Sequence, residues 1–290
     1  MQRDLCSSAK SAEGSYIHMS AMEMTNVTKQ FFKRAFSEDK RYDGRKLLDL
    51  NTVEIEYGVS NKAEGSARVK LGKTEVIAGV KLAISEPYPD SQDKGSLIVS
   101  GDLLPLASPR FELGPPGFDG IEIPRLVDRM IRESGMIDFK KLCIKEGEKV
   151  WTVFIDVYPI NDDGSLLDAA GIAAVAALKN ATMPALDKSG VIDYDAKTKE
   201  KLPISKETLP LSLTFYKLGN SILLHPTREE QEACDTKVTF GGSHWNGVLM
   251  INSCQKGWET TFTADEINHM MDVFPKKYEE LHKKVMEALK

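Results

Sequence analysis

The segment that most constrains the fold is an apolar strand at Val150–Tyr158 that leads through an acidic turn into an alanine-rich helix. Gly164 and Ser165 stand where this helix should begin. The first backbone N–H groups of a helix lack partners within the helix, and the helix dipole favours an anion there. A strand-to-helix turn of this composition is therefore typical of a phosphate site.

The residues around the turn argue against phosphate binding. Asp162 and Asp163 precede the glycine, and Asp168 follows within the first turn of the helix. Leu166 stands where a cation would be useful. Carboxylates close to a phosphate repel it. The sequence therefore predicts a degenerate phosphate turn at Gly164, Ser165 and Leu166. This turn would keep the backbone shape of a phosphate site but lack the charge needed to bind phosphate.

Composition excludes several classes of protein. The chain has 290 residues, 41% of them apolar and 28% charged, which is ordinary for a globular protein. Its net charge of −5 means that any contact with nucleic acid must be local. Without an apolar run of about 20 residues or a signal-peptide segment, we expect no membrane contact. Four well-separated cysteines and five scattered histidines predict a reducing, cytoplasmic location, no metal and no cofactor.

The hydrophobic periodicity predicts an α+β fold of two βα halves, with mixed or antiparallel sheets and helices packed on them. Residues 1–24 show no period, and we expect a flexible extension. The N-terminal half then spans 25–206, with a short helix near Gln30 and a core from about residue 42. The C-terminal half spans 207–290.

Individual elements can be placed within these halves. Alternation between residues 53 and 84 predicts an antiparallel meander with one buried face. Capping-box spacing at Asp119–Glu122 predicts the start of a helix that ends near Ser134. Residues 188–207 are polar and rich in Lys and Asp, which favours a loop. A second capping box at Thr263 should begin the last helix.

Three arginines, Arg125, Arg129 and Arg132, recur at i, i+4 and i+7 and so share one face of the first long helix. They could form a solvated face paired with neighbouring carboxylates. Alternatively, their guanidinium groups could bind the phosphates of an RNA strand. Three such contacts to single-stranded RNA give a salt slope of about −2, which suits one wall of a channel better than a stand-alone binder.

Two further groups leave alternatives open. Glu229 and Asp235 lie six residues apart after a strand, where paired carboxylates can do acid–base or metal chemistry, or simply be a solvated connection. His244 and Trp245 could stack on a base, or pack a hairpin turn.

These features together identify the chain as similar to a known family. The segments Asp43–Lys46, Gly65–Thr74 and Val153–Leu178 resemble RNase PH-type proteins. Other segments resemble the non-catalytic RNase PH-like subunit of the archaeal exosome: Gly95–Val99, Leu103–Ala107, Gly114–Pro116, Ile121–Arg129 and Val150–Val153. The resemblance covers the chain from about Tyr42 to its last residue.

The resemblance implies an RNase PH-type fold and a catalytically inactive chain. In active members the turn reads Gly-Ser/Thr-Arg and its arginine helps to bind inorganic phosphate, whereas here Leu166 occupies that position. Active members also carry two aspartates six apart, and here Glu229 stands at the first position and Asp235 at the second. Losing a preorganised phosphate-binding cation typically costs several orders of magnitude in rate. We therefore expect no catalytic residues of its own.

The resemblance also implies partners. Such a subunit alternates with an active RNase PH-like paralogue in a hexameric ring, three of each, with RNA-binding cap subunits on one face. Single-stranded RNA enters 3′ end first and is shortened by phosphate attack. Arg125 and Arg129, with Arg132 beside them, would contact that RNA next to the partner's active site. The alternatives are an active phosphate-dependent 3′-to-5′ exoribonuclease, and a scaffold or small-molecule kinase of related architecture.

Overall fold

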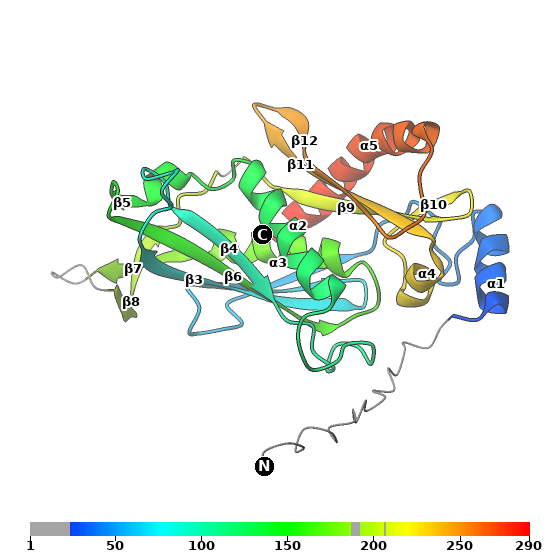
Figure 1. Cartoon of the computed structure of the whole chain (residues 1–290), viewed down its shortest axis with the longest axis horizontal. Helices are drawn as coiled ribbons and strands as arrows, with labels where there is room; N and C mark the ends of the chain where they lie inside the picture. The colour runs from blue at the N-terminus through cyan, green and yellow to red at the C-terminus, as the bar shows by residue number, and fades with distance from the viewer. Residues whose placement is uncertain (1–23, 187–191, 206) are drawn as a thin grey trace, which may run out of the picture.

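The computed structural model describes residues 24–186, 192–205 and 207–290. The extension expected at residues 1–24 therefore lies, apart from its last residue, outside the described residues. Two large β-sheets, a two-stranded sheet and five α-helices over the described residues confirm the mixed α+β prediction (Figure 1).

The first sheet has the strand order β1-β2-β3-β6-β4, with β5 paired to β6. Its strands are β1 (Val53–Tyr57), β2 (Gly65–Leu71), β3 (Thr74–Ser85), β4 (Ser96–Gly101), β5 (Cys143–Lys145) and β6 (Lys149–Asn161). Neighbours pair antiparallel except β4, which runs parallel to β6. Buried and partly exposed residues alternate along most of β3, so the predicted meander with one buried face is confirmed.

The second sheet has the order β10-β9-β11-β12 and is antiparallel throughout. Its strands are β9 (Leu211–Leu218), β10 (Ser221–Leu224), β11 (Thr236–Trp245) and β12 (Val248–Gly257). A separate hairpin joins β7 (Thr182–Leu186) to β8 (Ile192–Lys201). The loop predicted at 188–207 was wrong over β8. This strand depends on backbone pairing with β7, so its polar sequence shows no apolar period.

The helices cover and separate the two sheets. They are α1 (Asn26–Ser37), α2 (Phe118–Glu133), α3 (Leu166–Asn180), α4 (Arg228–Ala233) and α5 (Ala264–Ala288), with a short 3-10 turn η1 at Phe139–Leu142. The capping box predicted for α5 is confirmed, because Thr263 Oγ1 accepts from Glu266 N and Glu266 accepts from Thr263 N.

The capping box predicted for α2 was wrong. This helix begins at Phe118 after Gly117, which makes no side-chain capping bond. Asp119 instead lies inside the first turn, and Glu122 is buried with its Oε2 atom 2.6 Å from Lys237 Nζ. The buried lysine provides Glu122 with a stronger partner than a backbone N–H group would.

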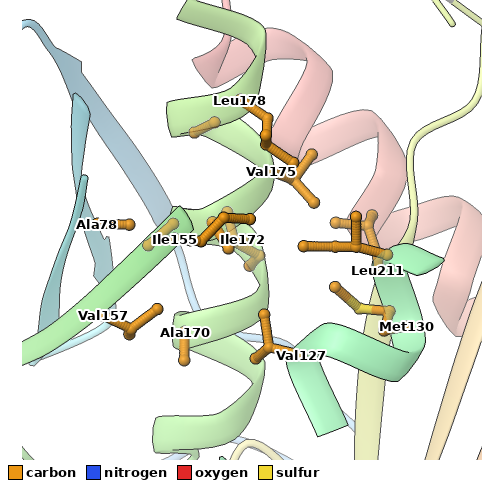
Figure 2. Close-up of a cluster of buried hydrophobic side chains, with 14 of the residues drawn as sticks. Ala78, Val127, Met130, Ile155, Val157, Ala170, Ile172, Val175, Leu178 and Leu211 are labelled. Atoms are coloured by element: carbon orange, nitrogen blue, oxygen red, sulfur yellow. The ribbon is translucent and has the colours of Figure 1, made fainter. Parts of the chain in front are cut away.

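Helix α3 forms the centre of the core between the two sheets. Figure 2 shows Ala78, Ile155 and Val157 of the first sheet on one side of α3. Leu211 of β9 and Met130 of α2 lie on its other side. The small residues of α3 allow this close packing, and so does β2, where a Cβ added at Gly65 would lie 2.4 Å from the Ala177 oxygen. The first turn of α3 is thereby fixed where the two sheets meet.

Candidate functional site

The turn before α3 has the left-handed backbone that its sequence suggests. Gly164 has φ +89° and Ser165 has φ +55°. A Cβ at Gly164 would lie 2.4 Å from the Pro226 oxygen, so only glycine fits. Ser165 is the N-cap residue of α3, yet its side chain makes no capping bond to the described helix. The turn therefore keeps a strained shape that local capping does not explain.

The N–H groups of this turn are bonded to the protein itself. Ser165 N donates to Gln231 Oε1 over 2.9 Å, and Asp163 N donates to Thr74 Oγ1 over 2.9 Å. Gly164 N donates to Asp162 Oδ1 over 3.2 Å. Backbone donors in such a turn are the groups that bind a phosphate. In this chain those three donors are already occupied.

Leu166 belongs to the hydrophobic core. Its side chain is 4% exposed and lines a small apolar pocket with Leu103, Ile123 and Val157. A cation at this position, with the same side-chain direction, would enter an apolar environment without a partner. Leu166 therefore contributes packing between α2 and β6 in place of charge.

Two of the three carboxylates expected to repel a ligand are directed into the protein, which corrects that expectation. Asp162 is buried, and its Oδ2 atom accepts from Arg110 Nε at 3.1 Å and from Arg110 Nη2 at 3.0 Å. Asp168 is fully buried and accepts from Ser212 Oγ at 3.0 Å and Thr214 Oγ1 at 2.9 Å. Sequence alone could not show these partners, because they come from distant segments.

Asp163, the third of these carboxylates, is partly exposed beside the turn. Burial raises its pKa, the charges of Glu229 and Asp162 add to that rise, and Lys73 and Arg45 oppose it. The carboxylates of Asp163 and Glu229 therefore lie near each other beside the turn, with Lys73 and Arg45 as nearby cations.

His225 and Asp168 form a buried pair below the turn. His225 has φ +46°, and its Nδ1 atom accepts from Asn51 N over 3.0 Å. Its Nε2 atom lies 3.9 Å from Asp168 Oδ2 and has no hydrogen-bond partner among the described residues. Burial lowers the pKa of His225 to about 3, and burial raises the pKa of Asp168 to about 6. Near pH 7 the histidine is therefore neutral and the aspartate is ionised.

The structure does not bring Glu229 and Asp235 together at the turn. Glu229 is exposed on α4 near Asp163. Asp235 follows α4 at its other end, where it accepts from Gly219 N over 3.0 Å and pairs with Lys29 of α1 at 2.7 Å. This pair thus lacks a shared site for acid–base or metal chemistry.

Sequence reasoning missed His225 and Gln231, which are also six residues apart and lie against the turn. Both are buried, and neither is acidic. The sequence signal that could have identified them is their six-residue spacing after a strand. His225 directly follows β10, and Gln231 lies on the short helix α4. The charged sequence Arg228–Glu232 is typical of a solvated turn, and for this reason helix α4 was not predicted.

The three arginines on the exposed face of α2 differ in their contacts. Arg132 donates to both carboxylate oxygens of Asp128, at 2.7 and 3.0 Å, and to the Leu97 oxygen of β4 at 2.8 Å. Arg125 and Arg129 are exposed and form no ion pair with any described residue. The paired-face interpretation therefore holds for Arg132, while Arg125 and Arg129 present free guanidinium groups to solvent.

Over the described ranges, the structure also bears on metal binding, on the cysteine thiols and on membrane-spanning helices. No cluster of three or more His, Cys, Asp or Glu side chains there is arranged to hold a metal ion. Cys143, Cys234 and Cys254 are free thiols. Within the same part of the chain, no helix is both long enough and apolar enough to cross a membrane.

Comparison with known proteins places the chain among exoribonuclease relatives. The family model "3′ exoribonuclease family, domain 1" matches residues 49–184. The chain is 42% identical over 275 residues to the exosome complex component Rrp42 of Thermococcus onnurineus, covering 93% of this chain and 99% of the relative. It is 40% identical over 266 residues to the Rrp42 component of Methanosarcina mazei, covering 92% and 96%.

A solved structure agrees with these sequence matches. The Archaeoglobus fulgidus exosome with RNA bound to the active site contains a chain that matches with a TM-score of 0.81 and 40% identity. The match covers 89% of this chain and 97% of that one. The protein described here is therefore a member of the RNase PH-type 3′ exoribonuclease family.

Proposed function

We propose that this chain is a non-catalytic subunit of an exosome ring and supports 3′-to-5′ phosphorolytic RNA degradation by an active paralogue. The observation that carries the proposal is the occupied turn, in which the Gln231 side chain accepts the Ser165 N–H that a phosphate would need. The relatives named as exosome components, and the related exosome structure with RNA at its active site, support the assignment.

Three requirements of phosphorolysis are missing at the turn. A phosphate needs free backbone donors, but those of Asp163, Gly164 and Ser165 are bonded within the chain. It also needs a cation, and Leu166 is buried in apolar surroundings. Finally, Glu229 and Asp235, which stand where active relatives carry two aspartates, do not meet at the turn, because Asp235 is bonded to Gly219 and Lys29 at the other end of α4. Together these losses remove the electrostatic stabilisation on which phosphoryl transfer depends.

The same proposal assigns partners and a location. The chain would alternate with an active RNase PH-like paralogue, three of each in a hexameric ring, which RNA-binding cap subunits cover on one face. The free guanidinium groups of Arg125 and Arg129 would bind single-stranded RNA beside the partner's active site, while Arg132 anchors α2 to β4. Free, well-separated cysteines suit a reducing cytoplasm.

Reconstitution tests this assignment. Mixed with an RNase PH-like paralogue whose turn reads Gly-Ser-Arg, the chain should form a 1:1 complex that releases nucleoside diphosphates from poly(A) and phosphate. Replacing the paralogue's turn arginine by alanine should lower that release by about 100-fold or more, because the cation that stabilises the transferring phosphate is lost. Release that survives this replacement would mean that the present chain contains a working site, and the proposal would fail.

A further inference from the structure

An exposed tryptophan stands at the tip of the β11–β12 hairpin. The hairpin turns through Asn246 and Gly247, with φ +51° and +78°, which is the backbone of a tight two-residue connection. Trp245, just before this turn, is 57% exposed, whereas Trp151 is 7% exposed. In Figure 1 the hairpin projects beyond the C-terminal end of α2. The indole is therefore one of the larger apolar groups that this chain presents to solvent.

The indole of Trp245 rests on the backbone that follows α2. A Cβ added at Gly135, where φ is +70°, would lie 2.7 Å from Trp245 Cζ3. Gly135 comes six residues after Arg129, which corresponds to about 9 Å along a helix at 1.5 Å per residue. Along the direction of α2, the backbone beneath the tryptophan is thus about 9 Å from Arg129 and about 15 Å from Arg125.

A cavity of about 800 Å³ opens beside Trp245. Three lysines line it, Lys94, Lys140 and Lys141, against the two carboxylates of Asp138 and Glu207. Lys141 pairs with Asp138 at 3.2 Å. Lys94 and Lys140 are exposed and make no ion pair with another described residue. The cavity therefore combines an aromatic surface with three lysines against two carboxylates, an excess of one positive charge.

We propose that this cavity is a second contact site for single-stranded RNA, in which Trp245 stacks on a base while Lys94 and Lys140 bind backbone phosphates. This combination is the one by which proteins hold single strands without sequence preference, since every base has a π-face and every nucleotide a phosphate. The inference rests on the proposed function, because it extends the RNA path that Arg125 and Arg129 begin.

The neighbouring strand offers a competing occupant. Val248, directly opposite Trp245 in the hairpin, is 59% exposed, and Met250 is 50% exposed. An apolar edge strand of this kind also suits a protein partner. The lysines favour RNA, because three of them face two carboxylates in the cavity, and a protein strand added to this edge would leave that excess positive charge unpaired.

Photocrosslinking within the reconstituted complex tests the site. Oligo(A) carrying a single 5-iodouridine, placed at successive positions from the 3′ end, should give a crosslinked peptide containing Trp245 at one of those positions. In parallel, Trp245→Ala should weaken binding of labelled oligo(A) by about 5- to 100-fold, the range for loss of one stacked base. Trp245→Phe, which keeps an aromatic face, should restore most of that affinity.

The outcomes separate this inference from the proposed function. If Trp245→Ala leaves RNA affinity unchanged while Arg125→Gln with Arg129→Gln lowers it, the second site is refuted and the first RNA contact stands. If Trp245→Ala instead weakens the complex with the paralogue without changing RNA affinity, the hairpin binds protein and the inference is also refuted. If neither set of changes affects RNA affinity, the proposed RNA path itself fails.

Discussion

Replacing Arg125 and Arg129 together by glutamate should weaken single-stranded RNA binding by the assembled complex by on the order of 100-fold, with assembly unchanged. The estimate follows from two charge-assisted contacts to phosphate at about 1.5 kcal/mol each. Both side chains are exposed and free of ion pairs over the described residues, so the replacement breaks no ion pair there. Degradation of limiting RNA should slow in parallel.

The salt dependence of RNA binding tests whether Arg125 and Arg129 contact phosphates. With glutamine at both positions, the slope of log affinity against log salt should become shallower by about 1.4, because two phosphate contacts contribute about 0.7 each. For the glutamate variant, Lys276→Glu with Lys283→Glu is the matched control, since it makes the same charge change at two exposed positions of α5. Equal RNA affinities for the arginine variant and this control would refute a local contact.

Arg41→Met should destabilise the chain by about 3–5 kcal/mol, the range for breaking a buried ion pair. The Arg41 side chain is fully buried, and its Nε atom donates to Glu230 Oε1 over 3.0 Å. The same guanidinium donates to the Leu224 oxygen at 3.0 Å and the His225 oxygen at 2.9 Å. Methionine keeps much of the side-chain volume but leaves the Glu230 carboxylate buried without its cation.

Urea unfolding at pH 7 measures this loss. Lys40→Met is the matched control, because its side chain is 72% exposed and its pair with Glu38 lies on the surface. Adding Glu230→Gln to Arg41→Met should recover part of the stability, since the uncompensated charge is then gone. A loss for Arg41→Met similar to that of the control would contradict the role assigned to this pair.

The Arg41–Glu230 pair also bears on the turn before α3. Glu230 accepts from Thr227 N and so belongs to the capping box of α4, the helix that carries Gln231. Loss of Arg41 should therefore loosen the hydrogen bond from Ser165 N to Gln231. The Arg41–Glu230 pair is thus connected to the occupied turn through the short helix α4.

Sequence patterns predicted the parts of the fold that depend on burial. The alternation along β3 and the alanine-rich composition of α3 are direct consequences of packing between two sheets. The β7–β8 hairpin was not predicted because β8 is held by backbone pairing with β7 and its polar sequence has no apolar periodicity. Helix α4 was missed because its six residues are mostly charged, while its stability comes from Thr227 and from burial of Glu230.

The site was only partly predictable for a similar reason. Helical spacing placed Arg125, Arg129 and Arg132 on one face, but it could not show that Asp128 and Leu97 engage Arg132 alone. The sequence drew attention to charged side chains, whereas Gln231, which accepts from Ser165 N, is a neutral amide, and His225, which lies below the turn, is a neutral imidazole. Their role becomes visible only when β10 and α4 are placed against the start of α3.

Nucleoside diphosphate release by the purified chain alone, supplied with poly(A) and orthophosphate, measures directly whether this chain is catalytically inactive. The occupied turn predicts release no faster than the uncatalysed background, both at saturating phosphate and after addition of Mg²⁺. Steady, phosphate-dependent release from a preparation free of any paralogue would show that the turn at Gly164–Leu166 still binds and uses phosphate, and would contradict the account.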